Sequence, residues 1–100
     1  MTQHTFRKKP VEIEAFQMTE ARRWDNSGWP QWLHEAWQQG DGEGGFFCDP
    51  PPDSEKVFLG TLEGVHVVSW GDWIIQGIAG QLYLCKPSIF SETYEKVSDD

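Results

Sequence analysis

The residues whose side chains are most able to bind a ligand or react lie around a glycine-aspartate corner in the second half of the chain. Asp72 and Trp73 form that corner, and Lys86 stands further along, ahead of Phe90 and Tyr94. A lysine at a strand end beside aromatic rings can hold an anionic or planar ligand by charge and stacking. The same rings can also pack a short helical turn onto a sheet, and the spacing favours this second interpretation.

The acidic side chain at the corner has two interpretations as well. At an exposed corner, the Asp72 carboxylate could present charge to a partner. Aspartate also hydrogen-bonds to the backbone of its own turn, and the preceding glycine permits that turn. We favour the turn role and keep Asp72 as a candidate binding residue together with Trp70, which adds an aromatic surface to the corner.

No motif with catalytic or metal-binding spacing is found. The two cysteines, Cys48 and Cys85, fit no zinc or redox pattern, and we expect free thiols in a reducing compartment. A nucleophilic pair of Cys85 with His66 stays open, because such pairs form in space rather than in sequence. Only Lys86 is placed to lower the pKa of that thiol. The sequence therefore indicates no catalytic residue, no metal and no cofactor.

The charge of the chain limits its partners. The formal net charge is −8 and the isoelectric point is near 4.7. A phosphate backbone would be repelled, so direct nucleic-acid binding is not expected. Solubility alone explains such a charge, and an acidic surface that competes with nucleic acid for a basic partner is the sharper alternative. We interpret the basic cluster at residues 6–9 as solvent-exposed side chains at the start of a strand, with an anion-binding site as the alternative.

Length and composition predict one domain. One hundred residues are too few for two stable cores, and six tryptophans supply much of the apolar area that one small core needs. No apolar run is long enough to cross a membrane, and the N-terminus does not resemble a secretory signal. We therefore expect a cytoplasmic protein with no membrane association.

The segment from Lys56 to Val97 is the organising element, because most of the β-forming residues lie there and glycines separate them. We expect a meander with turns at 63–64, 71–72 and 77–80. One helical turn should begin at Ser88 and run through Phe90 to Glu92. The predicted strands are residues 57–62, 65–70, 73–76, 82–85 and 94–97.

The first half of the chain predicts one more strand and one helix. Apolar and acidic residues alternate from Val11 to Phe16, after Pro10, which is typical of a strand with one wet face. Pro30 and Gly40 suit the first turn and the C-terminal cap of a helix. Five apolar residues with helical spacing would cover the sheet, with a ligand-stacking platform as the alternative: Trp29, Trp32, Leu33, Ala36 and Trp37.

A flexible glycine- and proline-rich loop is expected over residues 40–55. Its composition gives little regular structure, and a loop of this length in a small domain is usually mobile or functional. Phe46 and Phe47 are the exception. They should either anchor the loop in the core, which we favour, or remain available to a partner.

These elements together predict an α+β fold. We expect a bent, mostly antiparallel meander sheet of five or six strands, which could close toward a small barrel, covered by one amphipathic helix. The N- and C-terminal strands are expected to pair.

Three phrases of the chain are FRKKPVEIEAFQ, GDWIIQG and LYLCKPSIFSETYEKV. In this order they resemble a family of small phage and prophage proteins. The resemblance covers both ends of the chain and the meander, and it implies a phage accessory gene rather than a particular reaction. Trp70 departs from the family phrase, which usually has proline before the glycine-aspartate corner, and this weakens any role assigned to the corner by analogy.

Three functions of different classes follow. The leading one is a non-enzymatic accessory protein that binds a host or phage protein and could inhibit a host defence. The second is a small-ligand binder that sequesters an anionic, nucleotide-like molecule through Lys86 and the nearby rings. A phage assembly factor is a further alternative, and an enzyme has the least support.

Overall fold

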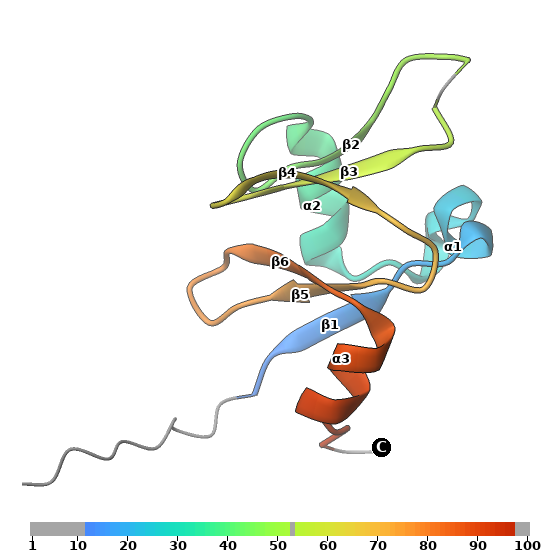
Figure 1. Cartoon of the computed structure of the whole chain (residues 1–100). Coiled ribbons are helices and arrows are strands. Elements are labelled where there is room, and N and C mark those ends of the chain that lie inside the picture. The colour runs from blue at the N-terminus through green and yellow to red at the C-terminus, as the bar shows by residue number, and fades with distance from the viewer. Residues whose placement is uncertain (1–11, 53, 98–100) are drawn as a thin grey trace, which may run out of the picture.

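The strands form two three-stranded antiparallel sheets. The computed structural model describes residues 12–52 and 54–97 (Figure 1). One sheet has the order β1-β5-β6, with β1 (Glu14–Gln17), β5 (Trp73–Gln76) and β6 (Leu82–Cys85). The other has the order β2-β3-β4, with β2 (Phe46–Cys48), β3 (Val57–Thr61) and β4 (Gly64–Val68). The α+β class is confirmed, and the strands within the described ranges form no closed barrel.

The prediction of a single bent sheet is wrong, and the corner at residues 69–72 is the reason. The chain leaves β4 at Val68 instead of Trp70, and then crosses from one sheet to the other. There the Gly71 N–H donates to the carbonyl oxygen of Met18 at 2.7 Å, and the Met18 N–H donates to that of Asp72 at 2.9 Å. The corner therefore pairs with the chain after β1 instead of continuing the β2-β3-β4 sheet.

The N-terminal strand lies beside β5. Ala15 pairs with Ile75 and Phe16 with Ile74. The predicted wet face is wrong at Phe16, which packs against the core, and Ala15, Phe16 and Gln17 are all partly buried. β1 starts at Glu14, and the predicted start at Pro10 and Val11 lies outside the described residues.

The predicted tryptophan-rich helix is confirmed as α2 (Gln31–Gln39). Pro30 is its N-cap, and Gly40 ends it with φ 85°, a backbone conformation that glycine adopts without strain. Trp29, just before the helix, packs against Phe46 of β2 with ring centroids 5.4 Å apart. Leu33 is fully buried, whereas Trp32 is only partly buried against the core.

α2 is not the only helix. α1 (Glu20–Trp24) begins at Thr19, whose side chain accepts from the Arg22 N–H, and η1 (Asn26–Gly28) follows. At the other end, α3 (Pro87–Thr93) is longer than the single turn expected, and its N-cap is Lys86 instead of Ser88.

The core lies between the inner faces of the two sheets and is closed by α2. Its buried side chains come from both sheets, the helix and the connections: Met18, Trp29, Leu33, Ala36, Phe46, Val57, Leu59, Val68, Ile74 and Leu82. Phe46 is fully buried, so it anchors its segment as expected.

The loop predicted over residues 40–55 contains β2 and is partly docked. The Gly44 N–H donates to the carbonyl oxygen of Gly60 at 2.8 Å. A Cβ atom on Gly60 would overlap the carbonyl oxygen of Gly42, so the loop lies directly on β3. The first part of the loop therefore covers one end of the β2-β3-β4 sheet.

The last predicted strand is absent. Residues 94–97 have no strand structure, and β1 pairs with β5 instead of with a C-terminal strand. The Tyr94 ring packs on Phe90 with centroids 4.9 Å apart. The aromatic side chain that suggested a strand therefore extends the packing of α3.

Candidate functional site

Asp72 is buried, contrary to the expectation of an exposed acidic corner. Only 1% of its surface is exposed. Its Oδ2 atom accepts from the Ser69 N–H at 2.9 Å and from the Lys86 Nζ at 3.2 Å. Its carboxylate thus joins the turn after β4 to the end of β6, and it offers little charge to a partner.

Lys86 connects the corner to α3, but its charge is already compensated. Its side chain is 57% exposed while it pairs with the buried Asp72. An anionic ligand would have to compete with that carboxylate. The geometry therefore weakens the anion-binding interpretation of this lysine.

The three aromatic residues of the predicted site do come together. Trp73 and Phe90 stack with centroids 4.0 Å apart and planes 5° from parallel, and Tyr94 continues the stack at 32° to Phe90. The Phe90 ring therefore packs against two other aromatic rings, those of Trp73 and Tyr94. The stack fixes α3 to β5, which is the packing role that the sequence favoured.

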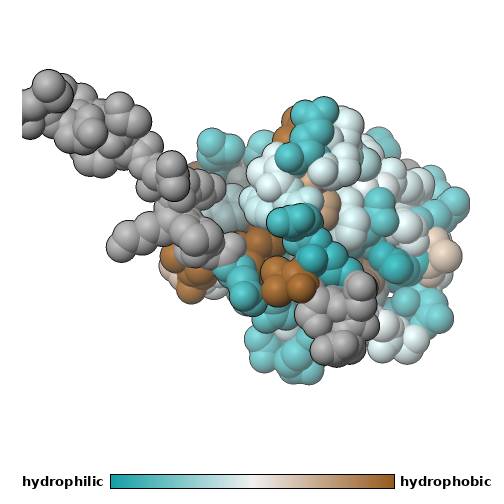
Figure 2. Space-filling model, turned by 90° about the horizontal axis from the view of Figure 1, so that it is seen from below, coloured by the Kyte–Doolittle hydropathy of each residue, from teal (hydrophilic) through white to brown (hydrophobic). Residues whose placement is uncertain are grey.

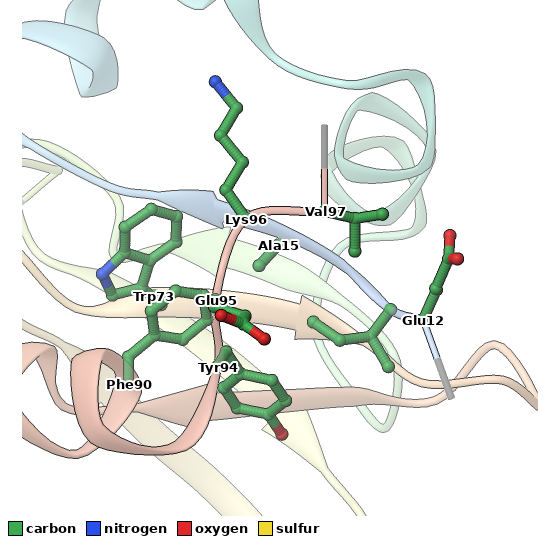
Figure 3. A pocket seen from close by; sticks show the side chains of 9 residues that line it. Glu12, Ala15, Trp73, Phe90, Tyr94, Glu95, Lys96 and Val97 are labelled. Atoms are coloured by element: carbon green, nitrogen blue, oxygen red, sulfur yellow. The ribbon is translucent and has the colours of Figure 1, made fainter. Parts of the chain in front are cut away.

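A pocket of about 500 Å³ lies beside this stack. Figure 3 shows the rings of Phe90 and Tyr94 on one side and the strand carrying Ala15 on the other, with the Lys96 amine extending away from the rings. The charged residues that line the pocket are Glu12, Glu95 and Lys96. With two acidic residues and one basic residue, this lining favours a neutral or cationic group over an anion.

The face that carries this pocket has only scattered apolar surface. Figure 2, viewed from below, shows separate brown patches between teal side chains. Ile89 of α3, 56% exposed, is one of the large apolar side chains that reach solvent.

The remaining predicted site residues lie elsewhere. Trp70 is 43% exposed and lines a shallow hollow with Glu55 and Lys56, away from the aromatic stack. Phe46 belongs to the core, and its neighbour Phe47 points to the opposite side of β2. These three candidate residues therefore lie in separate places: Trp70 at the corner, Phe46 in the core and Phe47 on a sheet face.

That sheet face is the largest feature that sequence reasoning missed. On the outer side of the β2-β3-β4 sheet, Phe47 pairs with Phe58 and Phe58 with Val67 in one cross-strand row. The Phe47 and Phe58 rings stack with centroids 5.5 Å apart. Val65 and Val67 are 58% and 53% exposed. We call Phe47, Phe58, Val65 and Val67 the outer patch.

Acidic residues border the outer patch at one end. Asp41 and Glu43 flank Gly42, whose carbonyl oxygen lies over Gly60 of β3. Glu63 stands at the tip of the β3-β4 hairpin, and all three carboxylate side chains are exposed. The patch thus combines an apolar centre with a negative border.

The cysteines give little support for thiol chemistry. Burial raises the pKa of the Cys85 thiol above its ordinary value, and the nearby Asp72 carboxylate raises it further. Less thiolate is then present at neutral pH, and the thiolate is the reactive form. Cys48 and Cys85 are both free in the structure.

The part of the chain that the structure describes contains neither a metal-binding cluster nor a membrane-spanning helix. No group of three or more histidine, cysteine or acidic side chains there is placed to hold a metal ion. Nor does any helix in those ranges have the length and apolar character needed to span a bilayer. Comparisons with protein-family models, curated proteins and solved structures find no match to this chain.

Proposed function

We propose that this protein acts by binding another protein through the outer patch. The observation that carries the proposal is the exposure of Val65 and Val67 beside the stacked rings of Phe47 and Phe58. Contiguous apolar surface on a small domain is costly in water and commonly marks an interaction site. Scattered exposed residues need no such explanation, but Phe47, Phe58 and Val67 form one cross-strand row, and Val65 lies two residues from Val67 on the same face of β4.

The resemblance of the sequence to small phage and prophage proteins supports the cellular setting of the proposal. The partner is then a host or phage protein met in the host cytoplasm, and inhibition of a host defence is one effect that such binding could have. An assembly factor would bind through the same surface and would recover a phage structural protein. The raised pKa of the Cys85 thiol and the lack of a metal-ligand cluster among the described residues give an enzymatic function no support.

A small-ligand function has one specific observation in its favour, the pocket beside Trp73, Phe90 and Tyr94. Because two acidic residues, Glu12 and Glu95, and one basic residue, Lys96, line it, a nucleotide-like anion fits it poorly. A thermal-shift screen should therefore give no stabilisation with nucleotides, since only ligands that prefer the native state raise the melting temperature.

The proposal is tested by quantitative capture from a lysate of infected host cells. The wild-type chain is compared with Val67→Glu, which places a charge in the outer patch, and with Ile89→Glu, which makes the same change on α3. Val67 and Ile89 have similar exposed fractions, 53% and 56%. We expect Val67→Glu alone to lose its specific partner. Equal recovery by all three proteins would contradict the proposal.

A further inference from the structure

Among the described strands, none pairs with the edge of β4 that faces away from β3, and this edge lies beside the outer patch. Gly60 of β3 faces β2, because its N–H donates to the Gly45 carbonyl oxygen at 2.9 Å and its own carbonyl oxygen accepts from Gly44 at 2.8 Å. Successive residues of a strand direct their pairing groups to opposite sides. Leu59 therefore faces β4, where its partner is His66.

The residues on either side of His66 must then face away from β3. The backbone N–H and C=O groups of Val65 and Val67 point outward, and β4 is an edge strand in its sheet. Exposed edges of this kind readily pair with another extended chain, and natural proteins usually protect them with charges, bulges or proline. Neither Val65 nor Val67 supplies such protection, and both side chains are exposed and apolar.

A groove runs along the inner side of the same edge. It has a volume of about 370 Å³ and lies between the β3-β4 hairpin and β6. His66 enters it from β4, whereas Tyr83 and Leu84 enter it from β6. Side chains of a strand paired with β4 would alternate between the outer patch and this groove, because successive side chains of a strand point to opposite faces.

We propose that β4 binds an extended segment of the partner as an added strand, and that this segment alternates apolar and basic residues. This inference rests on the proposed function and specifies how the partner protein is bound. Its apolar residues would extend the row formed by Phe47, Phe58 and Val67. Its basic residues, at the alternate positions, would point into the groove, where Glu63 is the acidic lining residue and Lys86 is already paired with Asp72.

The charge of the chain favours a basic segment over a second copy of this protein. Each copy carries a formal net charge of −8, so two copies of the chain repel each other. Like charges oppose such an association and opposite charges promote it. The hairpin tip, with Glu63, would be close to the end of an added strand.

The test uses a synthetic peptide in which valine and lysine alternate. A second peptide of the same sequence carries methyl groups on the backbone nitrogens of one edge, which keeps its charge but blocks strand pairing. In the protein, Val67→Pro removes the outward N–H without removing a hydrogen bond to β3, and edge strands tolerate proline at such a position. Val67→Thr is the matched control, since threonine has a similar shape and keeps the N–H.

We expect the unmethylated peptide to slow hydrogen exchange at the Val65 and Val67 amides, measured by NMR. Val67→Pro should weaken binding about tenfold, because one donor is lost and one acceptor of the peptide is left unpaired. Val67→Thr should bind within about twofold of the wild type. The methylated peptide is tested on the wild-type protein, so its result does not depend on whether a variant folds. Its binding should also be at least about tenfold weaker than that of the unmethylated peptide.

Equal binding of the two peptides would overturn strand addition, and so would protection confined to residues outside β4. Concentration-dependent dimerisation that Val67→Pro abolishes would assign the edge to a second copy and would also overturn the proposal. If the lysate partner is lost by Val67→Glu but kept by Val67→Pro, the outer patch binds without an added strand. In that case this inference fails while the proposed function stands.

Discussion

Replacing the buried carboxylate of Asp72 should separate its role as a hydrogen-bond acceptor from its role as a charge. Its Oδ2 atom accepts from the Ser69 N–H at 2.9 Å, and it pairs with Lys86 at 3.2 Å. A hydrogen bond to a charged group contributes about 1.5–3 kcal/mol to stability. An ion pair with a half-exposed lysine contributes up to about 1 kcal/mol.

Asp72→Ala removes both interactions and leaves the Ser69 N–H without its acceptor. We expect it to lower the free energy of unfolding by about 2–3 kcal/mol, a large share of a small domain's stability. Asp72→Asn keeps an acceptor for Ser69 and loses only the ion pair, so we expect a loss of about 1 kcal/mol. For a chain of this size, each kcal/mol corresponds to about 4–8 °C in Tm.

Urea unfolding followed by tryptophan fluorescence measures both variants. A double-mutant cycle of Asp72→Asn with Lys86→Gln isolates the coupling between the two charges, which should be below about 1 kcal/mol. If Asp72→Ala unfolded within about 0.5 kcal/mol of the wild type, the buried acceptor would not stabilise the corner. If Asp72→Asn cost as much as Asp72→Ala, the charge would matter more than the acceptor.

Three further predictions concern packing and reactivity. Gly60→Ala should expose the loop over residues 40–44 to limited proteolysis, because its Cβ atom would overlap a loop carbonyl oxygen, and unchanged digestion would contradict that contact. Trp29→Ala should cost about 3–5 kcal/mol in urea unfolding, since the side chain is buried and its indole N–H donates to Arg22 O at 2.7 Å; a loss below about 1 kcal/mol would be inconsistent with this burial. With its pKa raised, Cys85 should reach its maximal alkylation rate at a higher pH than a small model thiol does, measured in a Cys48→Ser background. A midpoint below that of the model thiol would show that the burial argument is wrong.

Sequence patterns predicted the helices and turns that depend only on neighbouring residues in the chain. The five apolar residues at helical spacing identified α2, and glycines identified the turns that separate β4, β5 and β6. The predicted turn at residues 63–64 is one residue off, because Gly64 already pairs with Thr61 in β4 and the turn is Leu62-Glu63. Phe46 and Phe47 were both expected as anchors; Phe46 is fully buried, whereas Phe47 is only partly buried and lies outside the core. α1 was missed although Thr19, a good N-cap residue, gives a signal for its start.

Features that depend on distant segments were not predictable in the same way. The burial of Asp72 requires the end of β6 and the chain after β1 to meet at one corner. The division into two sheets follows from that meeting as well. Residues 94–97 have the composition of a strand, but Tyr94 packs on Phe90 and no strand forms.

The outer patch was missed for a further reason. Phe47, Phe58 and Val67 come from three separate segments, and only the register of β2, β3 and β4 places them in one row. The alternation in each strand gives the face on which a side chain lies, but not which strands are neighbours. The candidate residues near Lys86 were easier to group because α3 follows β6 directly.

The pairing of β1 with β5 has a consequence for synthesis of the chain. β1 leaves the ribosome early, yet its hydrogen-bonding partner, and the Gly71 and Asp72 groups that bond to Met18, belong to the second half of the polypeptide. The nascent N-terminal segment must therefore wait without its native neighbours while the β3-β4 hairpin emerges and forms locally. Folding that depends on such distant pairing is slow and leaves apolar strands exposed in the meantime. Truncated products that end before β5 should accordingly be substrates for chaperones and proteases rather than stable fragments.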